Sequence, residues 1–244
     1  MIRVKDVTKW YGSTLAVDSV SFQVNTGEIV GFLGPNGAGK STVLKMISTW
    51  LPPTRGRIEV AGHDVVEEPL AVRRALGYLP EHNALYEGMR VNRFLRFMGR
   101  AHGLEGARLS ERLSWVIESC GVQAVLTKRI HQCSKGYRQR IGVAAALIHD
   151  PPVIILDEPT HGLDALQVVA FRSFVLGLRE GHAILFTSHI LNELTGTCDR
   201  ILIINEGNIL SDSRVEELEL KAKESGRSIE EVVLDIVRSA GGAQ

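Results

Sequence analysis

Short apolar runs alternate with longer segments of helical periodicity along most of this chain. Val20, Phe22 and Val24 alternate with polar neighbours, as expected of a strand with one buried face. The apolar run at 28–33 is followed by a glycine-rich turn and then by 41–50, whose residues favour a helix. This order predicts a strand, a glycine loop and a helix. Further short strands are predicted at 56–60, 77–79, 153–156, 183–186 and 200–204.

The pattern changes between about residues 82 and 147, where apolar residues recur at helical spacing. Phe94, Phe97 and Met98 predict a helix over 91–102, and a second helix is predicted over 109–120. Gly103 and Gly121 are the expected stops. After this region strands return, with a helix predicted at 165–179 between two of them. Strands that alternate with helices favour a largely parallel sheet covered on both faces.

We therefore expect a single α/β domain over 1–244. Its core would comprise 1–81 and 148–213, a helical insertion would occupy 82–147, and a charged tail at 214–244 would form a pair of short packing helices. The longest apolar stretches, such as 141–148, are far shorter than the roughly 20 residues of a membrane helix. The sequence thus predicts that any role at a membrane comes through a partner.

The amino-acid composition excludes few classes of protein, but it bears on which partners and metal sites are expected. The 28 basic residues equal the 28 acidic residues, so no overall field draws the chain to nucleic acid, and no nucleic-acid partner is expected. The three cysteines are widely spaced without a Cys-x-x-Cys pair, which favours reduced thiols over disulfides or a zinc site. Arg138 and Arg140 could attract acidic partners, although a solvated helix face is the simpler interpretation.

The glycine loop carries the strongest chemical signal. It fits the pattern G-x-x-x-x-G-K-[ST] between a predicted strand and a predicted helix, as a phosphate loop requires. Backbone N–H groups of such a loop surround phosphate oxygens, and the positive end of the following helix faces the same charge. Lys40 would neutralise the β- and γ-phosphates of ATP, and Ser41 or Thr42 would face Mg²⁺. The expected nucleotide-binding residues here are Gly34, Pro35, Asn36, Gly37, Ala38, Gly39, Lys40, Ser41 and Thr42.

A second element is the buried run at 153–156 that ends in Asp157 and Glu158. Asp157 suits magnesium, and Glu158 would then act as the general base that polarises the attacking water. An apolar run followed by two acids is a weak signal alone and a strong one beside a phosphate loop. Together the two elements predict a nucleotide-binding ATPase or kinase.

The segment that begins Cys133-Ser134-Lys135-Gly136-Tyr137 separates these classes. The chain here resembles the ATP-binding cassette (ABC) ATPases, whose signature Leu-Ser-Gly-Gly-Gln lies about this far before the Asp-Glu strand. Ser134 and Gly136 match the signature, whereas Cys133, Lys135 and Tyr137 depart from it. In this family the signature faces ATP held by another protomer, so the resemblance implies a dimer with two ATP molecules at the interface. It also implies a phosphate-loop NTPase fold with an N-terminal antiparallel β region.

The resemblance extends over nearly the whole chain and implies further site residues. Tyr11 matches the aromatic that stacks on adenine, although a packed tyrosine is the alternative. Asp164 matches the loop that contacts the opposite protomer, and His189 matches the switch histidine that senses the γ-phosphate, joining Lys40 and Glu158 as a catalytic candidate. Glu81 stands where the family has glutamine, so we expect a metal site of Ser41, Glu81 and Asp157 with altered metal dependence.

The sequence around Glu81 and Ser134 is most similar to bacterial exporter-type cassettes, including the branch associated with gliding motility. The expected function is therefore the ATP-hydrolysing subunit of a membrane exporter, cytoplasmic and bound to the inner face of the membrane through a separate permease. Two alternatives remain. One is a soluble cassette ATPase acting on a non-transport partner, and the other is a small-molecule kinase with a phosphate loop.

Overall fold

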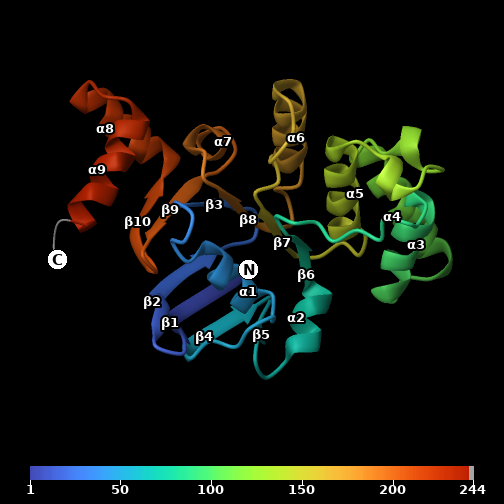
Figure 1. Cartoon of the computed structure of the whole chain (residues 1–244), viewed down its shortest axis with the longest axis horizontal. Coiled ribbons are helices and arrows are strands. Elements are labelled where there is room, and N and C mark those ends of the chain that lie inside the picture. The colour runs from blue at the N-terminus through green and yellow to red at the C-terminus, as the bar shows by residue number, and fades with distance from the viewer. Residues whose placement is uncertain (242–244) are drawn as a thin grey trace.

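The computed structural model describes residues 1–241 and consists of two sheets with helices around them (Figure 1). The larger sheet contains β3 (Ile29–Leu33), β6 (Leu76–Leu79), β7 (Val153–Asp157), β8 (Ala183–Ser188), β9 (Arg200–Asn205) and β10 (Asn208–Arg214). The smaller sheet contains β1 (Ile2–Tyr11), β2 (Thr14–Val24), β4 (Arg55–Val60) and β5 (His63–Asp64). The helices are α1 (Lys40–Ile47), α2 (Pro69–Ala75), α3 (Val91–Ala101), α4 (Gly106–Ser119), α5 (Lys135–Leu147), α6 (Ala165–Gly177), α7 (Leu191–Thr195), α8 (Val215–Ser225) and α9 (Ile229–Gly241).

The larger sheet has the strand order β10-β9-β3-β8-β7-β6, in which only the β9–β10 pair is antiparallel. Every residue of β3, β7 and β8 is buried, because side chains on both faces of these strands are covered. A strand buried on both faces has a continuous apolar sequence, and this is the run that the sequence shows at 28–33 and 153–156. The smaller sheet is antiparallel throughout. The expected phosphate-loop fold, with its mostly parallel core, N-terminal antiparallel region and helical insertion, is confirmed.

Alternate residues of the central strands enter two different hydrophobic cores. Val30 and Phe32 of β3 pack with the antiparallel sheet and α1. Ile29 and Leu33 pack on the other face, in the core that also holds the helices between residues 91 and 147. Figure 1 shows α3, α4 and α5 grouped at one end of the molecule, with α8 and α9 at the other end.

The helices differ from the expected ones mainly at their ends. The helix expected at 41–50 ends at Ile47, because Thr49 adopts a left-handed conformation with φ 65°. The helix expected from residue 109 begins at Gly106, one turn earlier. Within the described residues, the tail contains two helices, α8 and α9.

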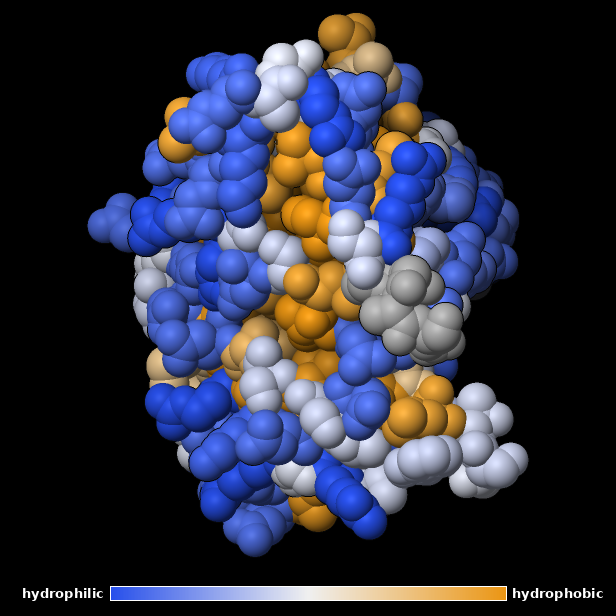
Figure 2. Space-filling model, turned by 90° about the vertical axis from the view of Figure 1, so that its left-hand side faces the viewer, coloured by the Kyte–Doolittle hydropathy of each residue, from blue (hydrophilic) through white to orange (hydrophobic). Residues whose placement is uncertain are grey.

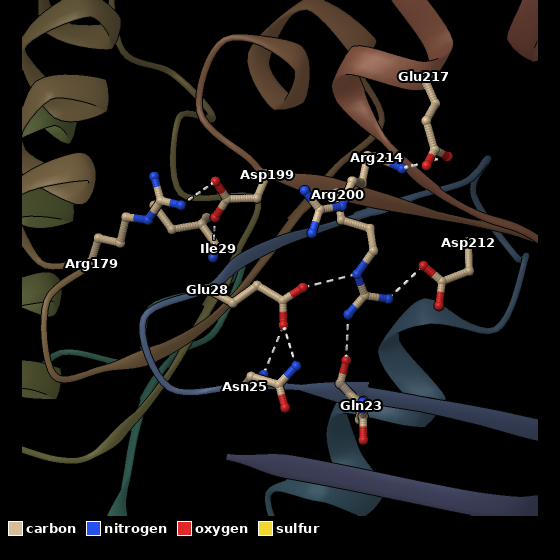
Figure 3. Close-up of polar contacts among 10 residues, drawn as sticks. All are labelled: Gln23, Asn25, Glu28, Ile29, Arg179, Asp199, Arg200, Asp212, Arg214 and Glu217. Carbon is tan, nitrogen blue, oxygen red and sulfur yellow. Dashed lines mark hydrogen bonds and ion pairs between the residues drawn. The ribbon is translucent and has the colours of Figure 1, made fainter.

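An ion-pair cluster joins the two sheets at the edge where β3 begins (Figure 3). The Arg200 guanidinium donates to Glu28 Oε1 at 2.9 Å, to the Gln23 backbone oxygen at 2.7 Å, and to the Asp212 carboxylate. Gln23 belongs to β2 of the antiparallel sheet, whereas Arg200 begins β9 of the parallel sheet. The Arg200 side chain is only 15% exposed, so the cluster holds the two sheets together in a place that water screens weakly.

The C-terminal helices carry a groove on one face of the molecule. Figure 2 shows an apolar strip between polar rims on the side that carries α8 and α9. Leu210, Val232 and Ile236 line this groove, together with charged residues such as Lys221 and Asp235. Among residues 1–241, no helix has the length and apolarity needed to cross a bilayer.

Candidate functional site

The carboxyl ends of four parallel strands bring the candidate residues to one edge of the sheet. The phosphate loop follows β3, Asp157 ends β7, and His189 directly follows β8. Glu81 lies two residues beyond β6. This is the edge at which open α/β sheets bind their ligands. A cavity of about 360 Å³ lies there, lined by Ala16, Pro35, Asn36, Gly37, Ala38, Gly39, Lys40, Ser41, Thr42, Glu81, Asp157, Glu158, His161 and His189.

The phosphate loop is held against neighbouring backbone that only glycine could approach. Gly39 has φ 105°, and a β-carbon there would lie 2.8 Å from the backbone oxygen of Ala16. The Ala38 backbone oxygen accepts a hydrogen bond of 2.9 Å from the N–H of Gly207, in the turn between β9 and β10. Gly207 in turn accepts a 2.9 Å bond from the N–H of Asp18 in β2. The loop is thus fixed from both sheets, and its residues 35–39 line the cavity.

Lys40 lies at the base of this loop. Its ammonium group donates to the backbone oxygens of Gly34, at 2.5 Å, and of Pro35, at 3.1 Å. The side chain is buried, and burial lowers its pKa while the nearby carboxylates of Glu158 and Asp157 raise it. A buried cation at the start of α1, beside a glycine-rich loop, gives the cavity an affinity for a polyphosphate anion.

The carboxylate of Asp157 is held by hydroxyl groups. Thr187 donates to Asp157 Oδ1 at 2.7 Å, and the Tyr78 hydroxyl donates to Oδ2 at 3.4 Å. Burial raises the pKa of Asp157, the charge of Glu81 raises it further, and the bond from Thr187 lowers it. Burial and the Asp157 charge also raise the pKa of Tyr78. A buried carboxylate of this kind is stabilised by a cation placed beside it.

Glu158 is paired with His189 across the cavity. Nδ1 of His189 lies 2.9 Å from Oε2 of Glu158. Glu158 has φ 48°, and its N–H donates to both the Thr187 hydroxyl, at 3.0 Å, and the Thr187 backbone oxygen, at 3.2 Å. Burial raises the pKa of Glu158, whereas His189 and Lys40 lower it. A carboxylate of raised pKa that faces a polar cavity has the properties of a general base.

The oxygen donors at this cavity suit Mg²⁺ that is bound together with a nucleotide. They do not suit a metal ion that is bound by protein side chains alone. Ser41, Glu81 and Asp157 all line the cavity, and all offer oxygen ligands. Within the described part of the chain, no group of three or more His, Cys, Asp or Glu side chains is placed to hold a metal ion. Magnesium is commonly bound by one or two protein oxygens together with substrate phosphates, so this donor set suits a cation that arrives with a nucleotide.

Five expected residues lie outside the lining of this cavity, and one of them is Gly34, the first residue of the phosphate loop. Ser134 caps the start of α5, where its hydroxyl accepts from the Tyr137 N–H at 3.3 Å. Asp164 caps the start of α6 and accepts from the Gln167 N–H at 2.9 Å. Gly136 packs against Gln167, since a β-carbon there would lie 2.7 Å from its amide oxygen. The remaining residue, Tyr11, is 44% exposed at the end of β1. The structure brings Ser134, Gly136 and Asp164 near one another but not to the phosphate loop of the same chain.

Sequence reasoning missed four residues of the site, one of which, Ala16, only lines the cavity. Thr187 bonds to both acidic residues, His161 lines the cavity, and Tyr78 reaches Asp157. His161 and Thr187 lie in the Thr-His-Gly-Leu-Asp and Phe-Thr-Ser-His segments that identified Asp164 and His189. Their nearness in the sequence was the only signal.

Comparison with known proteins agrees with this geometry. Residues 17–161 match the family described as ABC transporter, so the chain belongs to the ABC transporter family and is one of its ATP-binding, ATP-hydrolysing subunits. It is 40% identical over 205 residues to the ABC transporter ATP-binding protein NatA of Bacillus subtilis (strain 168), covering 83% of each chain. It is 39% identical over 236 residues to the daunorubicin resistance ATP-binding protein DrrA3 of Streptomyces coeruleorubidus, covering 95% of this chain and 73% of that protein.

The fold is likewise that of solved cassettes. A dimeric structure of MJ0796, a bacterial ABC transporter cassette, matches with a TM-score of 0.79 and 25% identity. The match covers 88% of this chain and 99% of that chain.

Proposed function

We propose that this chain is the ATPase subunit of a membrane exporter and that it works as a dimer with two Mg-ATP at the shared interface. The observation that carries the proposal is the Glu158–His189 pair, at 2.9 Å, in the same cavity as Lys40 and Asp157. A general base, a cation for phosphate and a metal-binding carboxylate at one sheet edge are the parts that ATP hydrolysis requires.

Each residue has a role that its surroundings support. Lys40 binds the β- and γ-phosphates once its contacts with the loop carbonyls are exchanged for phosphate oxygens. Glu158 accepts a proton from the attacking water, and His189 orients its carboxylate. Ser41, Asp157 and Glu81 would hold Mg²⁺, which neutralises charge on the phosphates. Tyr11 would stack on the adenine ring.

The proposed dimer rests on the family residues that lie outside the phosphate-loop cavity of their own chain. Ser134, Gly136 and Asp164 lie near one another at the starts of α5 and α6, away from the phosphate loop of their own chain. The first N–H groups of α5 can bind a phosphate that a second chain presents. We therefore assign these three residues to the ATP held by the second copy.

A permease would dock beside the Glu81 segment. Tyr86 and Phe97 are large apolar residues that remain 53% and 45% exposed. The Tyr86 ring lies 5.6 Å from Phe97 and 5.8 Å from the buried Phe94, so Tyr86 and Phe97 form one aromatic surface that rests on Phe94. An exposed aromatic surface of this kind suits a short helix of a membrane partner. Docking there would place the chain at the inner face of the membrane and link the partner to the metal site.

The test of hydrolysis is ATP turnover by the purified chain with Mg²⁺. We expect Glu158→Gln to lower kcat at least about a hundredfold, as expected on removal of a general base, while ATP binding is retained. Glu219→Gln removes the same charge from an exposed position on α8 and is the matched control. Unchanged turnover in Glu158→Gln would refute the assigned role.

The test of transport is recovery of tagged Glu158→Gln from detergent-solubilised membranes of the native host with Mg-ATP. A polytopic membrane protein in stoichiometric amount supports the exporter. Recovery of ribosomes or DNA-associated proteins would instead favour a cassette ATPase with a non-transport partner. A Glu158→Gln protein that stays monomeric at saturating ATP would contradict the dimer and favour a kinase.

A further inference from the structure

A second cavity, of about 130 Å³, lies between the C-terminal end of α4 and the facing sides of α5 and α6. It shares no lining residue with the phosphate-loop cavity. Its walls are mainly apolar and include Val143, Leu163, Phe171 and Phe174. The two phenylalanine rings lie 6.2 Å apart at 44°, which is the spacing of rings in contact, so together they form one aromatic wall of the cavity. An aromatic wall favours a flat apolar group packed against it.

One positive charge, that of Arg140, lies at the wall of this cavity. A β-carbon at Gly121 would lie 2.9 Å from Nη1 of Arg140, so the guanidinium packs directly over the glycine that follows α4. The charge of Arg140 also opposes the burial that raises the pKa of Cys120 to about 12, which places it close to that thiol. Glu118 lines the same cavity. Even so, no carboxylate of the described residues lies within ion-pair distance of Arg140.

The cavity lies behind the contacts that join α5 to the segment before α6. Gln139 donates to the backbone oxygen of Pro159 at 2.9 Å, and Gln167 packs against Gly136. Both glutamines line the cavity. A molecule in the cavity therefore lies between α5 and α6, whose first residues follow Ser134 and Asp164.

We propose that this cavity is a binding site for a small amphipathic anion, namely a carboxylate carried on a flat apolar ring. The ring would pack against the wall formed by Phe171 and Phe174 and against Val143, and the carboxylate would pair with Arg140. Burial of the ring supplies the hydrophobic part of the affinity, and the guanidinium supplies a charge-assisted hydrogen bond. An occupant would fix the separation of α5 and α6 and slow ATP turnover. This regulatory part rests on the proposed function, whereas binding does not.

Indole-3-acetate is the probe for binding, measured by titration calorimetry on the whole chain. Indole-3-acetamide has the same ring without the charge and is the control ligand. We expect Arg140→Leu to weaken indole-3-acetate about tenfold, the loss expected for one charged hydrogen bond, and to change the binding of the amide less than twofold. Arg108→Leu removes the same charge from an exposed position on α4 and should change neither.

The thiol of Cys120 locates the bound molecule. Alkylation of this thiol by monobromobimane is followed by peptide mass spectrometry. The rate should fall when indole-3-acetate is bound. Alkylation of Cys198 serves as the internal reference. Ala170→Trp places a ring in the cavity and should abolish both binding and protection. No saturable binding, equal binding by Arg140→Leu, or no protection of Cys120 would each overturn the site. If Arg140→Leu does not fold, Arg140→Gln and Ala170→Trp carry the same test.

The rate of ATP hydrolysis separates the binding part of the proposal from the regulatory part. Indole-3-acetate should lower the ATPase rate of the wild type but not that of Ala170→Trp. Binding without any change in rate would overturn the regulatory part alone. A chain that binds indole-3-acetate but hydrolyses no ATP would contradict the proposed function and leave the binding site standing.

Discussion

Thr187 links the two acidic residues of the site, and its removal tests how the site is built. The side chain is fully buried. Its hydroxyl donates to Asp157 at 2.7 Å and accepts the Glu158 N–H at 3.0 Å. Thr187→Val keeps the shape and loses both bonds. A hydrogen bond to a charged group contributes about 1.5–3 kcal/mol and a neutral one about 1 kcal/mol, so the free energy of unfolding should fall by about 2–4 kcal/mol.

Thr187→Ser is the matched control because it keeps the hydroxyl and loses only a methyl group. That loss costs about 1 kcal/mol in a buried position. Urea unfolding without nucleotide should therefore rank the wild type above Thr187→Ser and Thr187→Val lowest. The ATPase rate should follow the hydroxyl: Thr187→Val should lose about tenfold or more in kcat because Glu158 is no longer held in place, and serine should restore most of it.

The ranking is what can refute this reasoning. If Thr187→Val is as stable as Thr187→Ser, packing of the methyl group matters more than the hydroxyl bonds. If the stability ranking holds but both variants turn over ATP equally, the hydroxyl stabilises the fold without positioning Glu158.

Three further predictions follow from the described contacts. Arg200→Gln should lower the free energy of unfolding by about 2 kcal/mol at neutral pH. Because the ion pair lowers the pKa of Glu28, its stabilisation is present above the unfolded pKa and is lost as the pH falls, so urea unfolding at about pH 3 should show a smaller difference. Asp157→Asn should stabilise the nucleotide-free chain at neutral pH, because burial raises the pKa of this carboxyl and its charge opposes folding above that pKa. The gain in the free energy of unfolding, measured with urea, should disappear in acid. Gly39→Ala should abolish ATP binding measured by calorimetry, since a β-carbon meets backbone at 2.8 Å, whereas Gly37→Ala, at φ 83° with open space around it, should only weaken it.

The core of this fold could be predicted because its signals are local. A strand buried on both faces must be apolar throughout, and β3 and β7 are recognisable from that alone. Helix α2 and strand β10 escaped prediction for the opposite reason. Helix α2 has one buried residue, Val72, and β10 is a partly exposed edge strand, so neither carries a strong hydrophobic period.

The candidate site divides in the same way. Lys40, Asp157 and Glu158 lie in contiguous motifs, so their types and order could be read directly, and the structure brings them into one cavity. Thr187 and Tyr78 each donate a hydrogen bond to Asp157, from positions that are 30 and 79 residues away in the sequence. Pairing across such distances is decided by strand order, which no single segment encodes.

The Arg200 cluster has a mechanical consequence for the two sheets. It fastens them together where β3 begins, at the opposite end of that strand from the phosphate loop. The hydrogen bonds from Gly207 to Ala38 and from Asp18 to Gly207 fasten them again beside that loop. Two bodies joined at both ends cannot turn about either joint. We therefore expect the two sheets to move as one rigid unit, so that any displacement of the phosphate loop is shared by both of them.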